Sequence, residues 1–532
     1  MSRWSRYWFA DGGRLAAGVM RIAIACAVAL SLARLDRLDA TEVTRGLYRP
    51  VGIWMVLGHV APSALVVDAL WWIAWASTVA MAIGLYSRAA TAVSFVSAVA
   101  LASLSFSSSH TWSHQYNVVF LAQLAFLGAR GGDALSLDAV IRSMRGLPAR
   151  DVPRGYQWSV RLVQLAVALM FACAAFHKIL HGHFTLRWAL SDNLRNQLLV
   201  RFDLAGLDRP ALVDWIIDDP WRYRTAAMLN LVSQSAPILA CFLMRRPVLR
   251  AACGLFFVVE TVALALVVAL WNPQWLPLYA AFVDWDALVG WIARRPRPAE
   301  RTPDGWRPRR AARIFVIAFV AYDAVTAVVP ALDQWLNTYP FSGFPMFATV
   351  RARAPYDEHV PYSVPGDHFE VYADHPVAPN VQRWFDHANR AIADVRDPVE
   401  LRKRLAKVVR DGQARYPDAG IRGARLYLAI FAAPAYPAPA HFEPHPIAVV
   451  GELAADGTFR TALGALHGDR VVPAPQGVDL AGARFAYYRD DVPTPIAMTG
   501  DVVGPGDPIY AVAIAADGTP WLIASRAGWH WQ

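Results

Sequence analysis

The sequence predicts a polytopic membrane protein, an all-α bundle of about nine transmembrane helices followed by a C-terminal extramembrane α+β or mostly β domain. Of its 532 residues, 56% are hydrophobic and 12% are aromatic. The first two-thirds of the chain contains apolar runs close to the ~20 residues that cross a bilayer as a helix, whereas the last third contains none. These observations divide the chain into a multi-pass domain, 1–335, and an extracytoplasmic domain, 336–532, which is strand-rich toward its C-terminal end.

Nine apolar segments are the candidate spans. The first is interrupted by Arg21 and lacks a small-residue cleavage site, so we interpret it as a retained helix rather than a signal peptide. The fourth is short and the eighth contains Asp284 and Asp286, so these two fit a membrane span least well. The candidates are 13–34, 63–85, 88–107, 115–129, 157–179, 225–244, 250–271, 275–293 and 312–333.

The charges of the connecting loops predict the orientation. Arginine-rich loops, including 130–154, MRRPVLR and RRPRPAERTPDGWRPRRAAR, alternate with loops that mix arginines and acids, such as LDRLDATEVTR and 180–223. Because basic loops stay on the cytoplasmic side, we expect a cell-membrane protein with a cytoplasmic N-terminus and with 180–223 and 340–532 outside. These loops also account for most of the net charge of +9. The expected partner is therefore the lipid bilayer, and no nucleic acid is expected.

The region after about residue 340 changes character. TYPFSGFPMFATV is a turn-rich junction, and an amphipathic helical stretch follows at 381–411. Five strand-like runs come next: ARLYLAIFA, PIAVVGELA, ARFAYYR, IYAVAIA and WLIASRA. The sequence ADGT occurs at 455–458 and again at 516–519, each time between strand-like segments. Because Asp-Gly favours tight hairpin turns, both copies predict β-hairpins.

The cysteines and histidines predict neither disulfides nor a metal site. All four cysteines lie inside apolar runs, which favours small buried side chains: Cys26, Cys173, Cys241 and Cys253. The histidines at 177, 181 and 183 flank a lysine and have no acidic ligand close by, which is a poor zinc pattern.

Ionisable residues inside membrane spans are costly and tend to be functional. Five lie within or near the predicted spans: Arg21, Asp68, Lys178, Glu260 and Asp323. Lys178 ends the fifth span on the predicted outer side. One interpretation is an interfacial anchor, with the side-chain stem in lipid and the ammonium group among the headgroups.

The choice of lysine at 178 favours a different interpretation. Of 51 basic side chains only three are lysines, the others being Lys403 and Lys407. Arginine would anchor a helix equally well, but only a desolvated lysine gives up its proton near neutral pH. Lys178 is therefore predicted to be a deprotonable amine that acts as a general base or nucleophile.

A second polar group precedes the fourth span. The segment SSSHTWSHQYNVVFL, 107–121, contains His110, His114 and Tyr116. His114 and Tyr116 could face a cavity on the same side of the membrane as Lys178. The alternative is an interfacial aromatic belt with solvated histidines.

Two segments resemble a known family. FACAAFHKILHGHFTLRWALSDNL and SSSHTWSHQYNVVFLAQLAFLGARGGDALSLDAVI resemble the lysine-bearing and histidine-bearing segments of the vitamin K-dependent γ-carboxylase and its HTTM (horizontally transferred transmembrane) relatives. The likeness covers roughly residues 10 to 290. FSGFPMF also resembles a junction common in bacterial HTTM proteins.

The resemblance implies a reaction that uses reduced vitamin K or another quinol. In that family a base removes a hydroquinone proton, oxygen adds, and the strong base that results deprotonates a substrate glutamate, to which carbon dioxide adds. By resemblance Lys178 matches the catalytic base and His114 the histidine that assists carboxylation. His177 replaces a second lysine of the family and Glu260 a histidine of the seventh helix. With Tyr116, these two are the expected cofactor-binding residues.

The predicted function is a quinol-dependent carboxylase or epoxidase acting on a peptide or small molecule at the outer membrane face. Because His177 and Glu260 depart from the family pattern, a quinone-linked oxidoreductase or lyase is equally compatible. The alternative is a non-enzymatic membrane protein that binds a peptide or protein partner through its outer domain. A transporter ranks third, because the sequence lacks internal pseudo-symmetry and polar groups through the bilayer midplane.

Overall fold

The computed structural model describes most of the helical region and most of the strand-containing region. The described residues are 3–35, 50–57, 61–107, 114–150, 152–204, 209–243, 246–294, 308–328, 369–378, 397–430, 445–467, 470–488 and 510–525, with isolated residues between 379 and 396. The predicted junction 338–350, the domain boundary at 335/336 and His110 lie outside the described residues.

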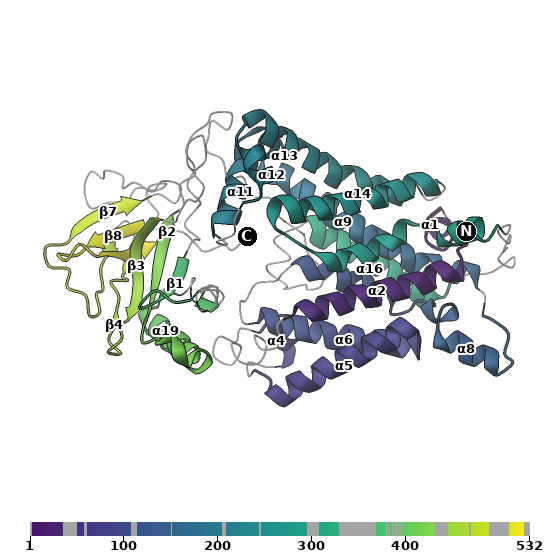
Figure 1. Cartoon of the computed structure of the whole chain (residues 1–532), viewed down its shortest axis with the longest axis horizontal. Helices are drawn as coiled ribbons and strands as arrows, with labels where there is room; N and C mark the ends of the chain where they lie inside the picture. Colours follow the sequence, from purple (N-terminus) through teal and green to yellow (C-terminus); the bar gives the residue numbers. More distant parts are fainter. Residues whose placement is uncertain are drawn as a thin grey trace.

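Among the described residues, five helices are long and apolar enough to cross a membrane, which indicates a membrane protein. Their bounds agree within a few residues with the first, second, third, fifth and seventh predicted spans. They are α2 (Arg14–Arg34), α5 (Ala64–Ile83), α6 (Ser87–Phe106), α9 (Gln157–His181) and α14 (Pro247–Val268). Figure 1 draws them side by side at one end of the molecule and the strands at the other.

Of the other four predicted spans, three are shorter or divided, and the ninth is described only in part. The fourth contains α7 (Asn117–Phe126), and α16 (Arg310–Val328) covers the described part of the ninth. In the sixth, α13 (Pro220–Ser235) gives way at Pro237 to a 3-10 turn, η5 (Ala236–Cys241). The count of nine spans stays a prediction.

The prediction of one helix over 275–293 was wrong. This segment forms a 3-10 helix, η6 (Pro273–Phe282), and then a separate helix, α15 (Trp285–Ile292). Pro277 lies inside η6 and cannot donate a backbone hydrogen bond. The carboxylate of Asp284 accepts a hydrogen bond from the Ala287 N–H at 3.1 Å, so it begins a new helix rather than continuing the old one.

Helix α9 is the most enclosed of the five long helices. The apolar stretch of α9 is 78% buried inside the protein, whereas the apolar stretches of α5 and α14 are 22% and 28% buried. The Phe171 ring of α9 stacks on Phe257 of α14 at 4.9 Å between centroids and meets Trp275 of η6 edge-on at 6.0 Å. Side chains projecting from α9 are therefore held by protein, whereas much of α5 and α14 is left to face lipid.

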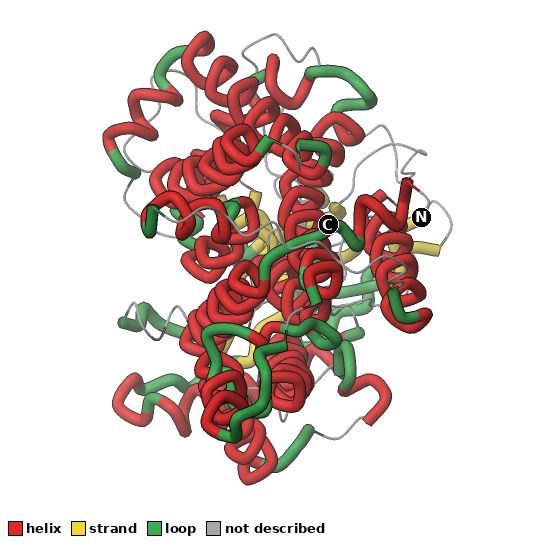
Figure 2. The backbone as a smooth tube through the Cα atoms, turned by 90° about the vertical axis from the view of Figure 1, so that its right-hand side faces the viewer, coloured by secondary structure: helices red, strands yellow, loops and turns green. Residues whose placement is uncertain are grey.

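Shorter helices connect the long ones, and Figure 2 shows the helical region, in red, in front of the strands, in yellow. α1 (Arg3–Trp8) precedes the first long helix, and the others lie between long helices in the sequence: α4 (Trp54–Leu57), η2 (His114–Tyr116), η3 (Gly131–Asp133), α8 (Leu137–Met144), η4 (Pro153–Gly155), α10 (Arg187–Leu190), α11 (Asn193–Leu204) and α12 (Ala211–Ile217).

The described part of the C-terminal region contains a seven-stranded sheet and one long helix. The sheet has the order β1-β2-β3-β9-β8-β7, with β4 paired to β3, and a separate hairpin joins β5 to β6. Among the described strands, only β3 and β9 pair in parallel. The strands are β1 (Phe369–Ala373), β2 (Ala424–Ile430), β3 (His445–Leu453), β4 (Phe459–Arg460), β5 (Ala465–His467), β6 (Arg470–Val472), β7 (Arg484–Tyr488), β8 (Tyr510–Ile514) and β9 (Pro520–Ser525).

The helix α19 (Pro398–Arg415) overlaps the predicted amphipathic stretch 381–411, but it begins later and ends four residues beyond it. Its start is set by Asp397, whose carboxylate accepts hydrogen bonds from the N–H groups of Val399 and Glu400 at 2.9 and 3.2 Å. Leu401 and Leu405 are buried, and they belong to the same apolar cluster as residues of β2 and β3.

Both ADGT hairpins are confirmed. The first joins β3 to β4 and the second joins β8 to β9. Gly457 and Gly518 have φ angles of 82° and 85°, which favour glycine. Asp456 and Asp517 each accept a hydrogen bond from the N–H two residues later. These N–H groups hold the pKa of both carboxyls below its ordinary value.

Candidate functional site

Lys178 lies at the C-terminal end of α9 and its side chain is buried, with 2% of its surface exposed. An interfacial anchor would place its ammonium group in the headgroup layer, outside the protein. The structure instead directs the amine toward α13, so the simple anchor interpretation was wrong.

Two amides of α13 accept hydrogen bonds from the Lys178 amine. The Nζ atom lies 2.5 Å from Asn230 Oδ1 and 2.8 Å from Gln234 Oε1. The two residues are four apart in the helix, so their side chains project from the same face. An ammonium group has three N–H donors, and the two amide oxygens accept two of them.

Glu260 of α14 accepts hydrogen bonds from the NH₂ groups of the same two amides. Its Oε1 atom accepts hydrogen bonds from Asn230 Nδ2 at 2.6 Å and from Gln234 Nε2 at 2.9 Å, and Oε2 accepts one from Ser233 Oγ at 2.6 Å. A carboxylate only accepts and an ammonium only donates, so each amide must turn its NH₂ to Glu260 and its oxygen to Lys178. This lysine–glutamate site, formed by Lys178, Asn230, Ser233, Gln234 and Glu260, therefore has one consistent orientation.

An indole ring covers the amine from another side. Lys178 Nζ lies 4.3 Å from the centre of the Trp188 ring, on the short helix α10. Trp188 belongs to a small buried cluster of alanines and a leucine from α9, α10 and α13, formed with Ala175, Ala189, Ala227 and Leu231. The amine thus has an apolar cluster on the Trp188 side, and an aromatic face is within reach of the charge.

A second buried polar cluster supports Trp188. The Asn193 side chain donates to the Trp188 carbonyl at 3.4 Å. Next to it, Asp192 accepts a short hydrogen bond from the Tyr223 hydroxyl and pairs with Arg224 at 3.4 Å. These contacts join α10 and α11 to α13. The Trp188 ring over Lys178 is therefore held in place by the hydrogen bond to the Trp188 carbonyl and by the contacts of nearby Asp192.

The structure places the other predicted site residues less completely. His177 is fully buried, and its ring meets those of Phe176 and His181 edge-on at 5.7 and 6.4 Å. Tyr116 is buried against Phe106 at 5.8 Å, in the bundle core rather than in the lysine–glutamate site. The side chain of His114 lies outside the described residues, so its proximity to Lys178 stays a prediction.

The backbone of the histidine segment is nevertheless tied to α9. The carbonyl of Gln115 accepts hydrogen bonds from Trp275 Nε1 at 2.7 Å and from Gln274 Nε2 at 3.3 Å. Trp275 in turn packs on Phe171, which precedes Lys178 by about two helical turns, roughly 10 Å along the axis. Trp275 therefore links the two segments singled out by the sequence.

Sequence reasoning missed the amides and the indole. It examined ionisable residues in the predicted spans, which found Lys178 and Glu260 but passed over Asn230, Ser233 and Gln234. These three occur at i, i+3 and i+4 in the predicted sixth span, a spacing that puts them on one helix face. A search for neutral polar residues repeated on one face of a span would have found them.

Comparisons with protein-family models, with curated proteins and with solved structures each find no match to this chain. Within the described part of the chain, no group of three or more histidines, cysteines or acids is placed to hold a metal ion.

Proposed function

We propose that the chain is a multi-pass membrane enzyme similar to the vitamin K-dependent γ-carboxylases, in which Lys178 is the general base. The observation that carries the proposal is the lysine–glutamate site: a buried amine held by two amide oxygens whose NH₂ groups are fixed by one carboxylate. A base must be held in place and kept from bulk water to work near neutral pH, and these contacts provide both.

The surroundings of the amine are compatible with a quinol. A quinol offers an acidic hydroxyl and a flat aromatic ring. The Lys178 nitrogen has one position, an N–H or a lone pair, that the two amides do not use, and it lies 4.3 Å from the centre of the Trp188 ring. The cofactor would supply the redox chemistry. Within the chain, Lys178 would accept the hydroxyl proton, Asn230 and Gln234 would hold the amine, and Glu260 would balance the positive charge that develops.

The substrate class follows from the resemblance and from the predicted topology. Lys178 ends α9 on the side where the loop charges predict the outer membrane face, and the strand-containing region follows on the same predicted side. A peptide or small molecule presented at that face, with carbon dioxide as the co-substrate, is the proposed substrate. Glutamate carboxylation and simple quinol oxidation are two forms of the same proposal, because both begin with proton removal by Lys178.

The experiment is a turnover assay on the detergent-purified protein. A reduced naphthoquinol is supplied under oxygen, its oxidation is followed by absorbance, and labelled bicarbonate reports any carboxylation. Lys178→Arg keeps a positive charge but stays protonated. We therefore expect it to lower the rate by roughly 10²–10⁴-fold, as the loss of a positioned base does. Lys407→Arg is the matched control, because Lys407 pairs with Asp411 at 3.0 Å on α19, far along the chain from the site.

A structural role for Lys178 predicts a different outcome. Lys178→Ala should lose activity in either case, but added ethylamine should restore part of the rate only if the amine is the base. Wild-type turnover in Lys178→Arg would reject the proposal. The alternative function, a non-enzymatic protein that binds a partner through its outer domain, predicts no turnover with naphthoquinols or benzoquinols in the wild type.

A further inference from the structure

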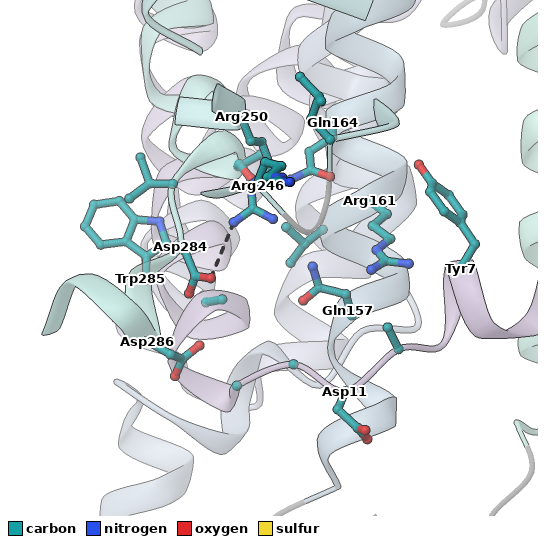
Figure 3. Close-up of a pocket in the computed structure, with 18 of the residues that line it drawn as sticks. Tyr7, Asp11, Gln157, Arg161, Gln164, Arg246, Arg250, Asp284, Trp285 and Asp286 are labelled. Carbon is teal, nitrogen blue, oxygen red and sulfur yellow. Dashed lines mark hydrogen bonds and ion pairs between the residues drawn. The ribbon is translucent and has the colours of Figure 1, made fainter. Parts of the chain in front are cut away.

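A second polar feature lies at the opposite end of α9. A cavity of about 720 Å³ is formed by α1, by the N-terminal turns of α9 and α14, and by the end of η6 (Figure 3). Arg161, which lines it, is separated from Lys178 by about 25 Å along the helix, at 1.5 Å per residue. The cavity is therefore independent of the lysine–glutamate site.

Arginine dominates the lining of this cavity. Five arginines and three aspartates line it, which leaves a formal charge of +2. The arginines are Arg3, Arg6, Arg161, Arg246 and Arg250, and the aspartates are Asp11, Asp284 and Asp286. Arg3, Arg6 and Arg246 are exposed, so they form a basic rim around a buried interior.

Two of the three aspartates form ion pairs with arginines other than Arg161. Asp11 pairs with Arg154 at 3.3 Å, and Asp284 pairs with Arg250 at 3.7 Å. Arg250 also donates from Nε to the Phe282 carbonyl at 3.1 Å. Arg250 is thus satisfied within the protein, and its position between η6 and α15 is structural.

Arg161 is different, because its charge is buried without an acidic partner among the described residues. Its side chain is 6% exposed and its guanidinium lies 4.7 Å above the Tyr7 ring. Within the described part of the chain, neither Nε nor Nη1 has a hydrogen-bond acceptor. Figure 3 shows the guanidinium facing the cavity beside Gln157. A buried, uncompensated charge is costly, and a bound anion would offset that cost.

We propose that this cavity binds a phosphate group, with the Arg161 guanidinium as its innermost contact. Guanidinium groups match phosphate oxygens in a planar, two-pronged geometry. The cavity lies at the ends of two candidate spans, and a span of this length covers the ~30 Å hydrocarbon core, so the cavity is at headgroup depth. Basic pockets between helices at this depth suit anionic lipid headgroups, and a free phosphorylated ligand would present the same chemistry.

The test measures binding to the detergent-purified full chain by the shift in melting temperature. Three probes separate the sources: phosphatidylglycerol, a diacylglycerol of the same acyl chains that lacks the phosphate, and inorganic phosphate. Arg161→Gln should need at least about tenfold more probe for the same shift, because it removes hydrogen bonds to a charged group, and about 1.4 kcal/mol corresponds to a factor of ten. The matched control is Arg313→Gln, an exposed arginine on α16 that does not line the cavity.

A second variant covers the case in which Arg161→Gln does not fold. Gln157 lines the same cavity and is half-buried, so Gln157→Glu places a repelling carboxylate there and leaves Arg161 in place. It should weaken phosphate binding in the same direction. A shift with phosphatidylglycerol alone assigns a lipid headgroup, and a shift with inorganic phosphate assigns a free ligand. An equal shift with diacylglycerol, no shift with any probe, or unchanged binding in both variants would overturn the proposal.

Discussion

At the scale of single residues, the site depends on how one amine and one carboxylate share two amides. Lys178 and Glu260 do not form a direct ion pair in the hydrogen-bond network. Asn230 and Gln234 lie between them. Each amide accepts a hydrogen bond from Lys178 and donates one to Glu260. Removing either charge leaves the opposite one buried without compensation, which is the costly outcome in a protein interior.

Glu260→Gln should destabilise the protein by about 3–5 kcal/mol, the cost typical of breaking a buried charge pair. Asn230, Gln234 and Ser233 all donate to Glu260, and the substituted amide would turn its own NH₂ donor toward at least one of them. Hydrogen bonds are therefore lost as well as charge. Unfolding in detergent, followed by denaturant or heat, measures the loss. Glu400→Gln is the control, because Glu400 is a half-exposed partner of Arg404 at 2.7 Å, and exposed pairs contribute about 0–1 kcal/mol.

A double variant sharpens this test. Lys178→Met combined with Glu260→Gln removes both charges, and it should be less destabilised than the sum of the two single variants. Strict additivity of the two losses would show that the lysine and the glutamate are not coupled through the amides.

At the scale of elements, Arg21 joins three parts of the helical region. Although it lies inside α2, its guanidinium donates to the Met81 carbonyl of α5 at 2.8 Å and makes a short hydrogen bond to the Leu135 carbonyl. Arg21 is therefore a structural residue that satisfies carbonyls at the end of α5. The turn that follows α5 leaves room for it because residue 84 is a glycine, with a φ of 72°.

Gly84→Ala should destabilise the bundle by at least about 2 kcal/mol more than Gly146→Ala. Both glycines have positive φ angles, 72° and 67°, so both substitutions pay the same backbone strain. At position 84, however, the new Cβ would lie 2.0 Å from Arg21 Nη1, whereas at position 146 it meets nothing within 4 Å. The difference combines displaced Arg21 hydrogen bonds, at about 1.5–3 kcal/mol each, with a clash against Ser136 Cβ at 2.3 Å. Equal melting temperatures in detergent for the two variants would contradict this role of Arg21.

At the scale of the whole molecule, the polar features separate along the helical region. The arginine-lined cavity and α8 lie toward the end that carries the N-terminus, whereas α11 lies toward the strands (Figure 1). This arrangement agrees with loop charges that predict the cytoplasm at the first end and the outside at the second. An amine site at the outer end and a phosphate site at the inner end would then use different faces of one bundle.

Topology reporters fused at Gly146, Pro303 and Gly451 check this arrangement. The first two should report a cytoplasmic location and the third an outer one, because the basic loops around 130–154 and 294–313 resist translocation. Protease protection of the same fusions in sealed vesicles is an independent measurement. A cytoplasmic signal at Gly451, or an outer signal at Gly146, would invert the predicted orientation or change the number of crossings.

The sequence by itself determined where most long helices run, because apolar length and helix-ending residues act locally. It also determined both ADGT hairpins, in which Asp-Gly fits the turn, and it singled out Lys178 and Glu260 as charges too costly to bury without a purpose. The prediction failed at 275–293, where the apolar composition indicated one helix although Pro277 and Asp284 divide the segment into two.

Only the tertiary structure decided what these charges contact. Asn230, Ser233 and Gln234 share one helix face, but they carry no charge, and their spacing does not say what they bind. The packing of α13 against α9 and α14 decides that they join Lys178 to Glu260. Likewise Arg161 looks like one more basic residue near a membrane surface until α1 and Tyr7 enclose it. The physical reason is the same in both cases: the free energy of a buried polar group depends on partners that are distant in the chain, and packing alone brings those partners together.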